Sequence, residues 1–263
     1  MRILARSICA ILLLLLYALV SLGILALPAG RVRKRSLLTR TTSLTARFVL
    51  LVLGVRVTVR RRRQRRSRPR RNYLVLANHL TYVDILVIAS VMPGVFITSE
   101  ELRRTFPLGS LARFGGSLFV ERRSPAGLKR EISEIAGVLR EGTTVILFPE
   151  GTTSNGDTVR PFKNSLLTAA LATGTTILPV CIRYLRIDGN PIDHRNRDTL
   201  YYYGGTTFFE HLPRMLRHRS VEVECILLRP IAARSGCSRK DLAALAHDAI
   251  STVYHRRHPA PRP

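Results

Sequence analysis

The chain has 263 residues, which is enough for one hydrophobic core of ordinary size beside a short membrane segment. Lys and Arg total 42 against 17 Asp and Glu, and this balance of +25 predicts attraction to polyanions such as phospholipid headgroups, nucleic acid or phosphorylated substrates. The four cysteines are scattered with no C-x-x-C, which argues against a disulfide framework or zinc site and favours a reducing compartment.

The first predicted element is a transmembrane helix. Residues 8–27 are a run of 20 without a charge, which as a helix is about as long as the hydrocarbon core is thick. The basic flank is heavier after the run than before it, so we expect residues 1–35 to anchor the chain in the cell (inner) membrane, with the domain that follows facing the cytoplasm. A cleaved signal peptide is the alternative, but the long run and the absence of an A-x-A site favour the anchor.

A second apolar stretch covers residues 44–59. Leu44, Phe48, Leu51 and Val55 fall at helical spacing, which fits either an amphipathic helix in the membrane interface or a core helix of the soluble body. Gly54 is expected to end this helix. The alternating valines that follow predict a strand at 55–59.

Residues 60–71 hold nine arginines. A run of this kind is typical of a solvated loop, and near an anionic leaflet each basic residue adds about 1 kcal/mol of attraction. We therefore expect a loop that also holds the domain against membrane phospholipids. No aromatic residue is interleaved for base stacking, which disfavours a nucleic-acid role.

Strand and helix patterns alternate along the rest of the chain, residues 36–258. Strands are predicted at 73–77, 95–98, 117–120, 144–148, 176–183 and 221–228. Helices are predicted at 84–91, 125–140 and 165–172, and from the capping-box sequence at 238 to about residue 254. This alternation predicts an α/β fold with a sheet covered on both faces, and the proline-rich residues 259–263 are expected to be a disordered tail.

The first motif, Asn78-His79-Leu80-Thr81-Tyr82-Val83-Asp84, stands between a strand and a helix. Residues five apart on one helix point in different directions, so His79 must lie in the preceding loop to meet Asp84. Thr81 is expected to cap the helix, and Asp84 in the first turn is favoured in its ionised form by the helix dipole. An ionised Asp84 would fix the tautomer of His79, which is then able to take a proton from an alcohol. The alternative is a capping aspartate beside an ordinary loop histidine.

Later blocks supply candidate substrate-binding groups. Arg122 follows a short strand after two glycines and is suited to a phosphate, and Lys163 is expected to share that phosphate. In Phe148-Pro149-Glu150-Gly151-Thr152 a buried strand ends, so Glu150 is expected to bond a substrate hydroxyl. Gly151 lets the backbone approach a ligand, and Thr152 adds a hydroxyl donor. Neither H-E-x-x-H nor G-x-S-x-G is present, so no metal and no serine nucleophile are predicted.

Together with Leu178-Pro179-Val180, these blocks resemble the glycerophospholipid acyltransferase family, in particular the 1-acylglycerol-3-phosphate acyltransferases. The resemblance implies that His79 is the general base and Asp84 its partner. It also implies that Arg122, Glu150 and Gly151 hold the acyl acceptor. The expected fold is α/β, a mixed central sheet flanked by helices. The expected donor is acyl-coenzyme A or acyl-acyl carrier protein, with no cofactor.

The resulting expectation is a membrane-bound acyltransferase that moves a fatty acyl group from a thioester to the free hydroxyl of a lysophospholipid. The first acceptor is 1-acylglycerol-3-phosphate, which would give phosphatidic acid. The arginine-rich loop and Tyr201-Tyr202-Tyr203-Gly204 depart from the usual pattern, so lyso-ornithine lipid is the alternative acceptor. A non-enzymatic basic protein that binds membranes or nucleic acid is the second alternative.

Overall fold

The computed structural model describes residues 1–62, 72–121, 127–234 and 236–256. The helices of these segments are α1 (Arg2–Ala26), α2 (Arg31–Leu53), α3 (Val83–Val91), α4 (Glu100–Arg103), α5 (Leu108–Phe114), α6 (Leu128–Arg140), α7 (Thr168–Thr173), α8 (Phe208–Arg217) and α9 (Arg239–Tyr254). The strands are β1 (Val55–Arg61), β2 (Leu74–Ala77), β3 (Val95–Ser99), β4 (Leu118–Val120), β5 (Val145–Leu147), β6 (Ile177–Ile187), β7 (Asn190–Pro191) and β8 (Val221–Leu227).

The strands form one mixed sheet in the order β1-β8-β6-β2-β5-β3-β4, with the short β7 paired to β6. The five strands from β6 to β4 run parallel, β8 is antiparallel to β6, and β1 is parallel to β8. The mixed α/β fold expected from the resemblance is therefore confirmed. Because β2, β5 and β6 are parallel neighbours, the residues that follow them meet at one edge of the sheet.

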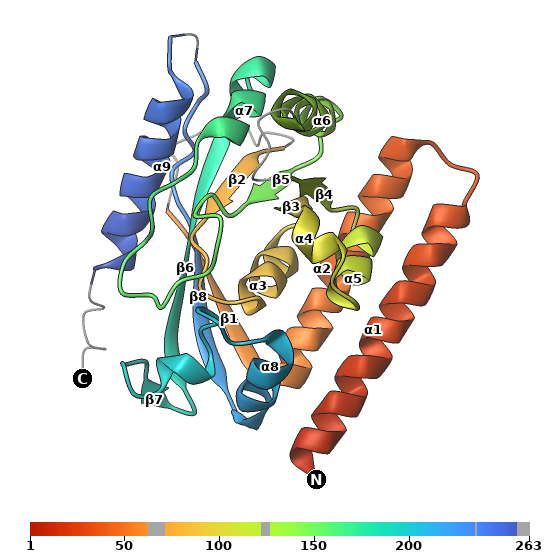
Figure 1. Cartoon of the computed structure of the whole chain (residues 1–263), viewed down its shortest axis with the longest axis vertical. Helices are drawn as coiled ribbons and strands as arrows, with labels where there is room; N and C mark the ends of the chain where they lie inside the picture. Colours follow the sequence, from red (N-terminus) through yellow and green to blue (C-terminus); the bar gives the residue numbers. More distant parts are fainter. Residues whose placement is uncertain (63–71, 122–126, 235, 257–263) are drawn as a thin grey trace.

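Helices cover both faces of this sheet, α2, α3 and α8 on one side and α6, α7 and α9 on the other (Figure 1). Alternate residues of β2 serve the two cores. Val75 and Ala77 pack with α2 and α3, whereas Leu74 and Leu76 pack with α6 and α7. A strand buried on both faces explains why residues 74–77 form a continuous apolar run.

The predicted strands and helices are confirmed to within a few residues, with informative exceptions. The strand predicted at 176–183 continues to Ile187. The helices α4 and α5 were not predicted, because each is short and the segment contains Pro107 and Gly109, which weaken a helical pattern. The helix predicted from residue 44 starts at Arg31 instead, so the proposed domain boundary at residue 35 falls inside α2. The division into anchor and catalytic domain stays a prediction.

The helices α1 and α2 lie side by side as a hairpin against the body (Figure 1). Both are long and apolar enough to cross a membrane by length and composition. Along α1 only Tyr17, Ser21 and Ile24 are buried, and α1 also contacts α5 and α8. At its first turns, Arg2 donates to the carbonyl of Arg217 at 2.9 Å, and Arg6 donates to the carbonyls of His218 and Arg219. These arginines satisfy carbonyls at the C-terminal end of α8.

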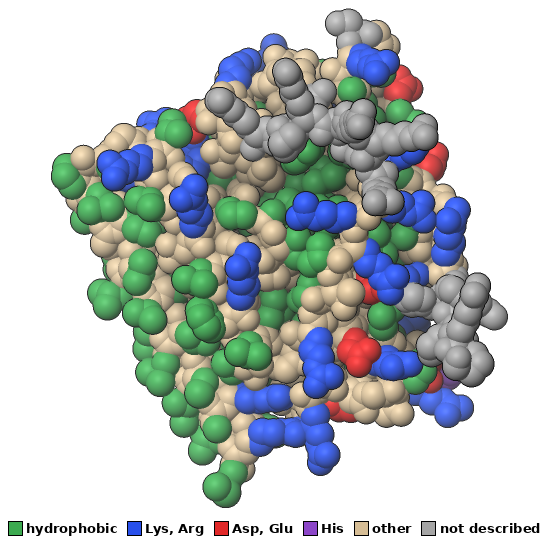
Figure 2. Space-filling view, turned by 180° about the vertical axis from the view of Figure 1, so that it is seen from behind, with side chains coloured by type: hydrophobic (Ala, Val, Ile, Leu, Met, Phe, Trp, Pro, Cys, Tyr) green, Lys and Arg blue, Asp and Glu red, His purple; other side chains and the backbone are tan. Residues whose placement is uncertain are grey.

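An apolar surface runs along the outer side of this hairpin. Figure 2 shows hydrophobic side chains gathered on the side of the molecule where α1 lies. Most of the large ones belong to α1, for example Leu12, Leu15 and Leu19, which are 59%, 61% and 68% exposed. The stripe predicted on α2 is also largely exposed, at Leu44, Phe48 and Leu51, whereas the core of α2 is made by other residues, among them Ala46, Val49, Leu50 and Leu53. A membrane-facing stripe on α2 fits this exposure better than a core stripe.

Gly54 makes the sharp passage from α2 into β1. It caps α2 in the left-handed conformation, with φ of 74°, and a Cβ there would collide with the carbonyl oxygen of Arg219. Glycine at this position ends the helix, as the sequence predicted.

We expect Gly54→Ala to lower the free energy of unfolding by about 3 kcal/mol, because backbone strain adds to the collision with Arg219. Gly174→Ala is the matched control. Gly174 is also left-handed, with φ of 63°, but a Cβ there meets nothing within 4 Å, so its loss should be about 1 kcal/mol. Denaturant unfolding measures both variants, and equal losses would contradict the role of the Arg219 contact.

Candidate active site

The site begins where β2 ends. The main chain of β2 pairs with β6 up to Ala77, and the side chain of the buried Asn78 continues this pairing. The Asn78 amide donates to the Ile182 carbonyl at 2.9 Å, and its oxygen accepts from the Ile182 N–H at 2.7 Å. An asparagine therefore holds the chain against β6 while the backbone turns away. This contact fixes the position of the next residue, His79.

His79 and Asp84 form a hydrogen-bonded pair, as predicted. His79 Nδ1 lies 3.0 Å from Asp84 Oδ2, and the His79 side chain is 16% exposed whereas Asp84 is fully buried. The imidazole ring stacks on Phe148, with 4.0 Å between ring centroids and 16° between planes. The ring is therefore held by a carboxylate at its edge and by an aromatic ring on its face.

Asp84 is held by donors on both of its oxygens. Its Oδ2 also accepts from the backbone N–H groups of Leu80 at 2.6 Å and Thr81 at 3.0 Å, and its Oδ1 accepts from the Tyr184 hydroxyl at 2.7 Å. The prediction that Thr81 caps α3 is wrong, because the capping position is Tyr82 and the Thr81 hydroxyl has no partner among the described residues. Asp84 lies in the first turn of α3, and its carboxylate reaches back to the N–H groups of the turn that precedes the helix.

Three donors other than His79 already reach Asp84, one on Oδ1 and two on Oδ2, as expected for an acceptor-only carboxylate, and with such a partner the shared proton of the pair belongs to His79 Nδ1. The other ring nitrogen, Nε2, is then the one able to accept a proton. This is the tautomer that a histidine general base requires. The geometry therefore supports proton abstraction from an alcohol at Nε2.

Glu150 is brought to the same place from the end of β5. Its Oε1 accepts from the backbone N–H of His79 at 2.8 Å, and its Oε2 accepts from the backbone N–H of Arg160 at 3.1 Å. The residue is 5% exposed. The substrate contact predicted for Glu150 stays a prediction, and the structure places this side chain against the backbone of the loop that carries His79.

Gly151, Thr152 and Lys163 lie on the loop that leaves β5 and returns. Lys163 N donates to the Pro149 carbonyl at 2.9 Å, which closes the base of the loop. Gly151 has φ of 78°, and a Cβ there would lie 2.9 Å from Lys163 Nζ. Lys163 therefore passes over a glycine that leaves room for it, and both Lys163 and Thr152 are exposed. The Gly151 N–H donates to the Phe148 carbonyl.

Three predictions concern residues that the structure does not describe. Arg122 lies outside the described residues, as do residues 63–71 of the arginine-rich loop and residues 259–263 of the tail. The expected sharing of a phosphate between Arg122 and Lys163 therefore stays a prediction. Tyr184 and Phe148 are the site residues that the sequence did not single out individually.

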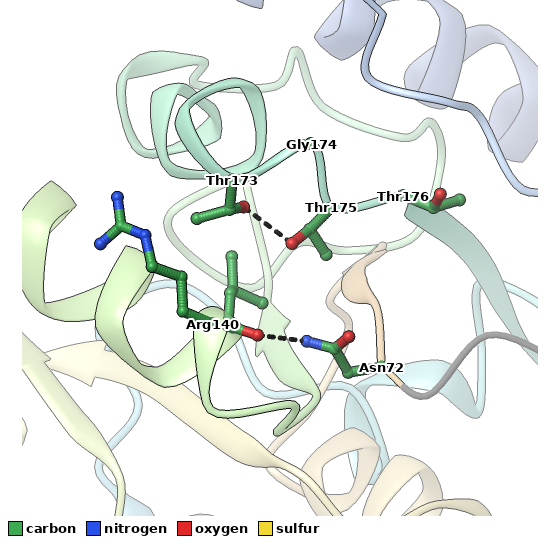
Figure 3. Close-up of a pocket in the computed structure, with 7 residues that line it drawn as sticks. Asn72, Arg140, Thr173, Gly174, Thr175 and Thr176 are labelled. Carbon is green, nitrogen blue, oxygen red and sulfur yellow. Dashed lines mark hydrogen bonds between the residues drawn. The ribbon is translucent and has the colours of Figure 1, made fainter.

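A cavity of about 480 Å³ lies elsewhere, at the opposite edge of the sheet (Figure 3). It is lined by residues that precede β2 and β6 or end α6, namely Asn72, Leu139, Arg140, Thr173, Gly174, Thr175 and Thr176. The Thr173 and Thr175 hydroxyls bond each other at 2.7 Å. None of the predicted site residues is among the residues that line this cavity.

Comparisons with known proteins identify the family of the chain. Residues 56–183 match the family model described as Acyltransferase. The chain is 32% identical over 218 residues to a lyso-ornithine lipid O-acyltransferase of Rhizobium meliloti, covering 80% of this chain and 73% of that protein. It is 33% identical over 111 residues to a 1-acyl-sn-glycerol-3-phosphate acyltransferase of Neisseria gonorrhoeae, covering 42% and 44%.

The fold is similar to that of a solved structure, the 1-acyl-sn-glycerophosphate (LPA) acyltransferase PlsC from Thermotoga maritima. The TM-score is 0.64 at 21% identity, over 97% of this chain and all of that one. A histidine–aspartate pair at the carboxyl edge of this mixed sheet, together with the matched family region, defines a class of acyl-transferring enzymes. The chain belongs to the acyltransferase family. It is thus an enzyme, and the non-enzymatic alternative is set aside.

The burial of Glu150 should make the stability of the protein depend on pH. Burial raises its pKa to about 7 from an ordinary 4.5, although the N–H groups of His79 and Arg160 act in the opposite direction. Between these two pH values the folded protein holds a proton that the unfolded chain has released. Stability therefore falls as the pH rises through this window.

We expect the stability of Glu150→Gln relative to wild type to increase with pH. Its free energy of unfolding minus that of wild type should be about 2 kcal/mol larger at pH 8 than at pH 5. Its activity should be lower at every pH, because an amide offers one acceptor oxygen to two backbone N–H groups. The exposed Glu134→Gln controls for the change in net charge. A stability difference that does not vary with pH would contradict the raised pKa of Glu150.

Proposed function

We propose that the protein is a membrane-associated O-acyltransferase in which His79 deprotonates the free hydroxyl of a lysolipid. The hydroxyl oxygen attacks the carbonyl carbon of an acyl thioester, an ester bond forms, the carbon–sulfur bond breaks, and the thiolate leaves as a thiol with the proton that His79 took up. The observation that carries this proposal is the buried, fully bonded Asp84 that holds His79 in the required tautomer. General-base assistance of this kind accelerates a reaction by about 10²–10⁴-fold.

The remaining groups have supporting roles in the proposal. Glu150 positions the backbone of His79, and its two backbone contacts support this role rather than a direct contact with substrate. Lys163, exposed beside Gly151, contacts the acidic part of the acceptor headgroup together with Arg122. A backbone N–H beyond Gly151 stabilises the oxyanion, since the N–H of Gly151 is already bonded to Phe148.

The acceptor that the comparisons favour is lyso-ornithine lipid. The relative with that activity in its name matches 73% of its length to this chain, whereas the 1-acyl-sn-glycerol-3-phosphate acyltransferase matches 44%. The second acceptor, 1-acylglycerol-3-phosphate, is supported by the shared motif region. Both reactions use the same dyad and the same acyl donor class, acyl-coenzyme A or acyl-acyl carrier protein.

The exposed apolar side of α1 supports attachment to the cell membrane, which is where a lysolipid acceptor resides. We place the body on the cytoplasmic side, because the basic residues at 31–40 are concentrated after α1. A protein of net charge +25 is also drawn to anionic lipids.

Membranes that contain the protein are incubated with labelled acyl donor and a panel of lysolipids. Wild type is expected to acylate lyso-ornithine lipid with a higher kcat/KM than 1-acylglycerol-3-phosphate. His79→Ala should lower kcat by about 10²–10⁴-fold while the protein stays in the membrane fraction. The exposed His194→Ala is the matched control. Near-normal turnover by His79→Ala would remove His79 from the mechanism, and a preference for 1-acylglycerol-3-phosphate would reverse the acceptor assignment.

Lys163→Ala tests headgroup binding. We expect KM for the acceptor to rise about tenfold with kcat within about twofold, because a cation that binds substrate and transition state equally affects KM alone. Lys129→Ala, on α6 across the sheet, removes the same charge at an exposed position and should change neither constant. A fall in kcat at constant KM would assign Lys163 to the chemical step instead.

A further inference from the structure

Tyr184 occupies a special position on β6. It follows Ile182 by two residues, so both side chains point to the face of the sheet where α3 lies, and both belong to the same core. Ile182 is the residue that pairs with the Asn78 side chain. The same short part of β6 therefore contacts both ends of the catalytic motif.

The backbone of β6 is irregular at this residue. In the pairing of β6 with β8, Tyr184 is opposite Val223 and Arg186 is opposite Glu222, so Leu185 is an extra residue between them. A bulge of this kind bends a strand and redirects the side chains beside it. The Tyr184 ring is 5% exposed, and its hydroxyl is directed at Asp84 Oδ1 at 2.7 Å.

The hydroxyl of Tyr184 is the donor to Asp84 Oδ1. The other three donors to Asp84, from His79, Leu80 and Thr81, all reach Oδ2. Among the described residues no second donor reaches Oδ1. Burial, together with the neighbouring Asp84, raises the pKa of Tyr184 well above its ordinary value, so the phenol keeps its proton and donates it to this bond.

We propose that Tyr184 is a positioning residue of the catalytic dyad. It holds the Asp84 carboxylate in one orientation, and through it the tautomer and direction of the His79 ring. This inference rests on the proposed function, because it assigns Tyr184 a part in that reaction. Tyr184 acts through Asp84 and contacts no reacting atom.

Other titratable groups interact with Asp84 and bear on its test. Besides His79 and Tyr184, these are Glu150 after β5, Tyr201 in the same core as Tyr184, Tyr254 at the end of α9, and Cys225 on β8. Burial raises the pKa of Cys225 to about 12 and raises the pKa of Tyr201 and Tyr254 as well, so these three stay protonated at neutral pH. Glu150 is shared by wild type and all variants below, so differences between them isolate the dyad.

Tyr184→Phe removes the hydroxyl and keeps the ring. We expect kcat to fall about tenfold with KM within about twofold, and the acid limb of the pH–rate profile to move about one unit to higher pH, because the ionised carboxylate loses a donor. Tyr201→Phe is the matched control, since this buried ring lies 5.9 Å from that of Tyr184 and its hydroxyl makes no hydrogen bond to Asp84 in the described structure. Its kinetics should match wild type.

The His79→Ala background separates positioning from general damage. If Tyr184 acts only through the dyad, Tyr184→Phe should cause no further loss when His79 is already absent. An additional tenfold loss in this background, or an unmoved acid limb, overturns the proposal. Thermal unfolding shows whether Tyr184→Phe is folded. If it is not, 3-fluorotyrosine in place of Tyr184 keeps the hydroxyl as a stronger donor, and the acid limb should then move to lower pH.

A measurement without turnover keeps this inference distinct from the proposed function. Nitrogen-15 spectra of the histidines, assigned with His79→Ala, report the proton on Nδ1. Tyr184→Phe should shift this resonance and Tyr201→Phe should not. A panel of lysolipids that yields no product contradicts the proposed reaction, whereas an unshifted Nδ1 resonance in Tyr184→Phe contradicts the role of Tyr184.

Discussion

The structure depends on one buried negative charge. Asp84 is completely enclosed, and a carboxylate in such a place costs several kcal/mol unless hydrogen bonds replace its water. Those bonds come from the turn after β2, from the His79 ring and from the middle of β6, so all three must be placed together. The parallel pairing of β2 with β6, extended by the side chain of Asn78, sets their separation. The requirement of one carboxylate thus explains why the motif must stand where it does in the sheet.

The local parts of the site could be predicted from the sequence, because they depend on residues close in the chain. The five-residue spacing alone does not establish the pair. A strand followed by a helix start places His79 and Asp84 within reach, and this setting together with the later blocks allows the pair to be inferred. Tyr184 lies 100 residues from Asp84, and the apolar pattern of its strand was taken to end at residue 183. Following the alternation from Val180 through Ile182 to Tyr184 would have revealed a buried tyrosine on the same face.

Other differences have the same origin, since periodicity describes a face and not what covers it. The stripe of Leu44, Phe48 and Leu51 was correctly predicted as one side of a helix, and the sequence left open whether that side faces the membrane or the core. In the structure this side is exposed, and a different side of α2 packs on α3. Glu150 was recognised as unusual after a buried strand, yet its contacts with the backbone of His79 and Arg160 depend on a loop that closes at Lys163. No spacing in the sequence reports that closure.

The attachment of Arg2 and Arg6 to the end of α8 has a consequence for how substrate is reached. A helix joined to its domain only by a linker lets the domain swing above a bilayer at a variable height. Here both ends of α1 are tied, one by α2 and the other by these arginine–carbonyl contacts, so the distance between α1 and the His79 imidazole is fixed. In the proposed reaction, with α1 in the membrane, a lysolipid that diffuses laterally within its leaflet would reach His79 without leaving the bilayer.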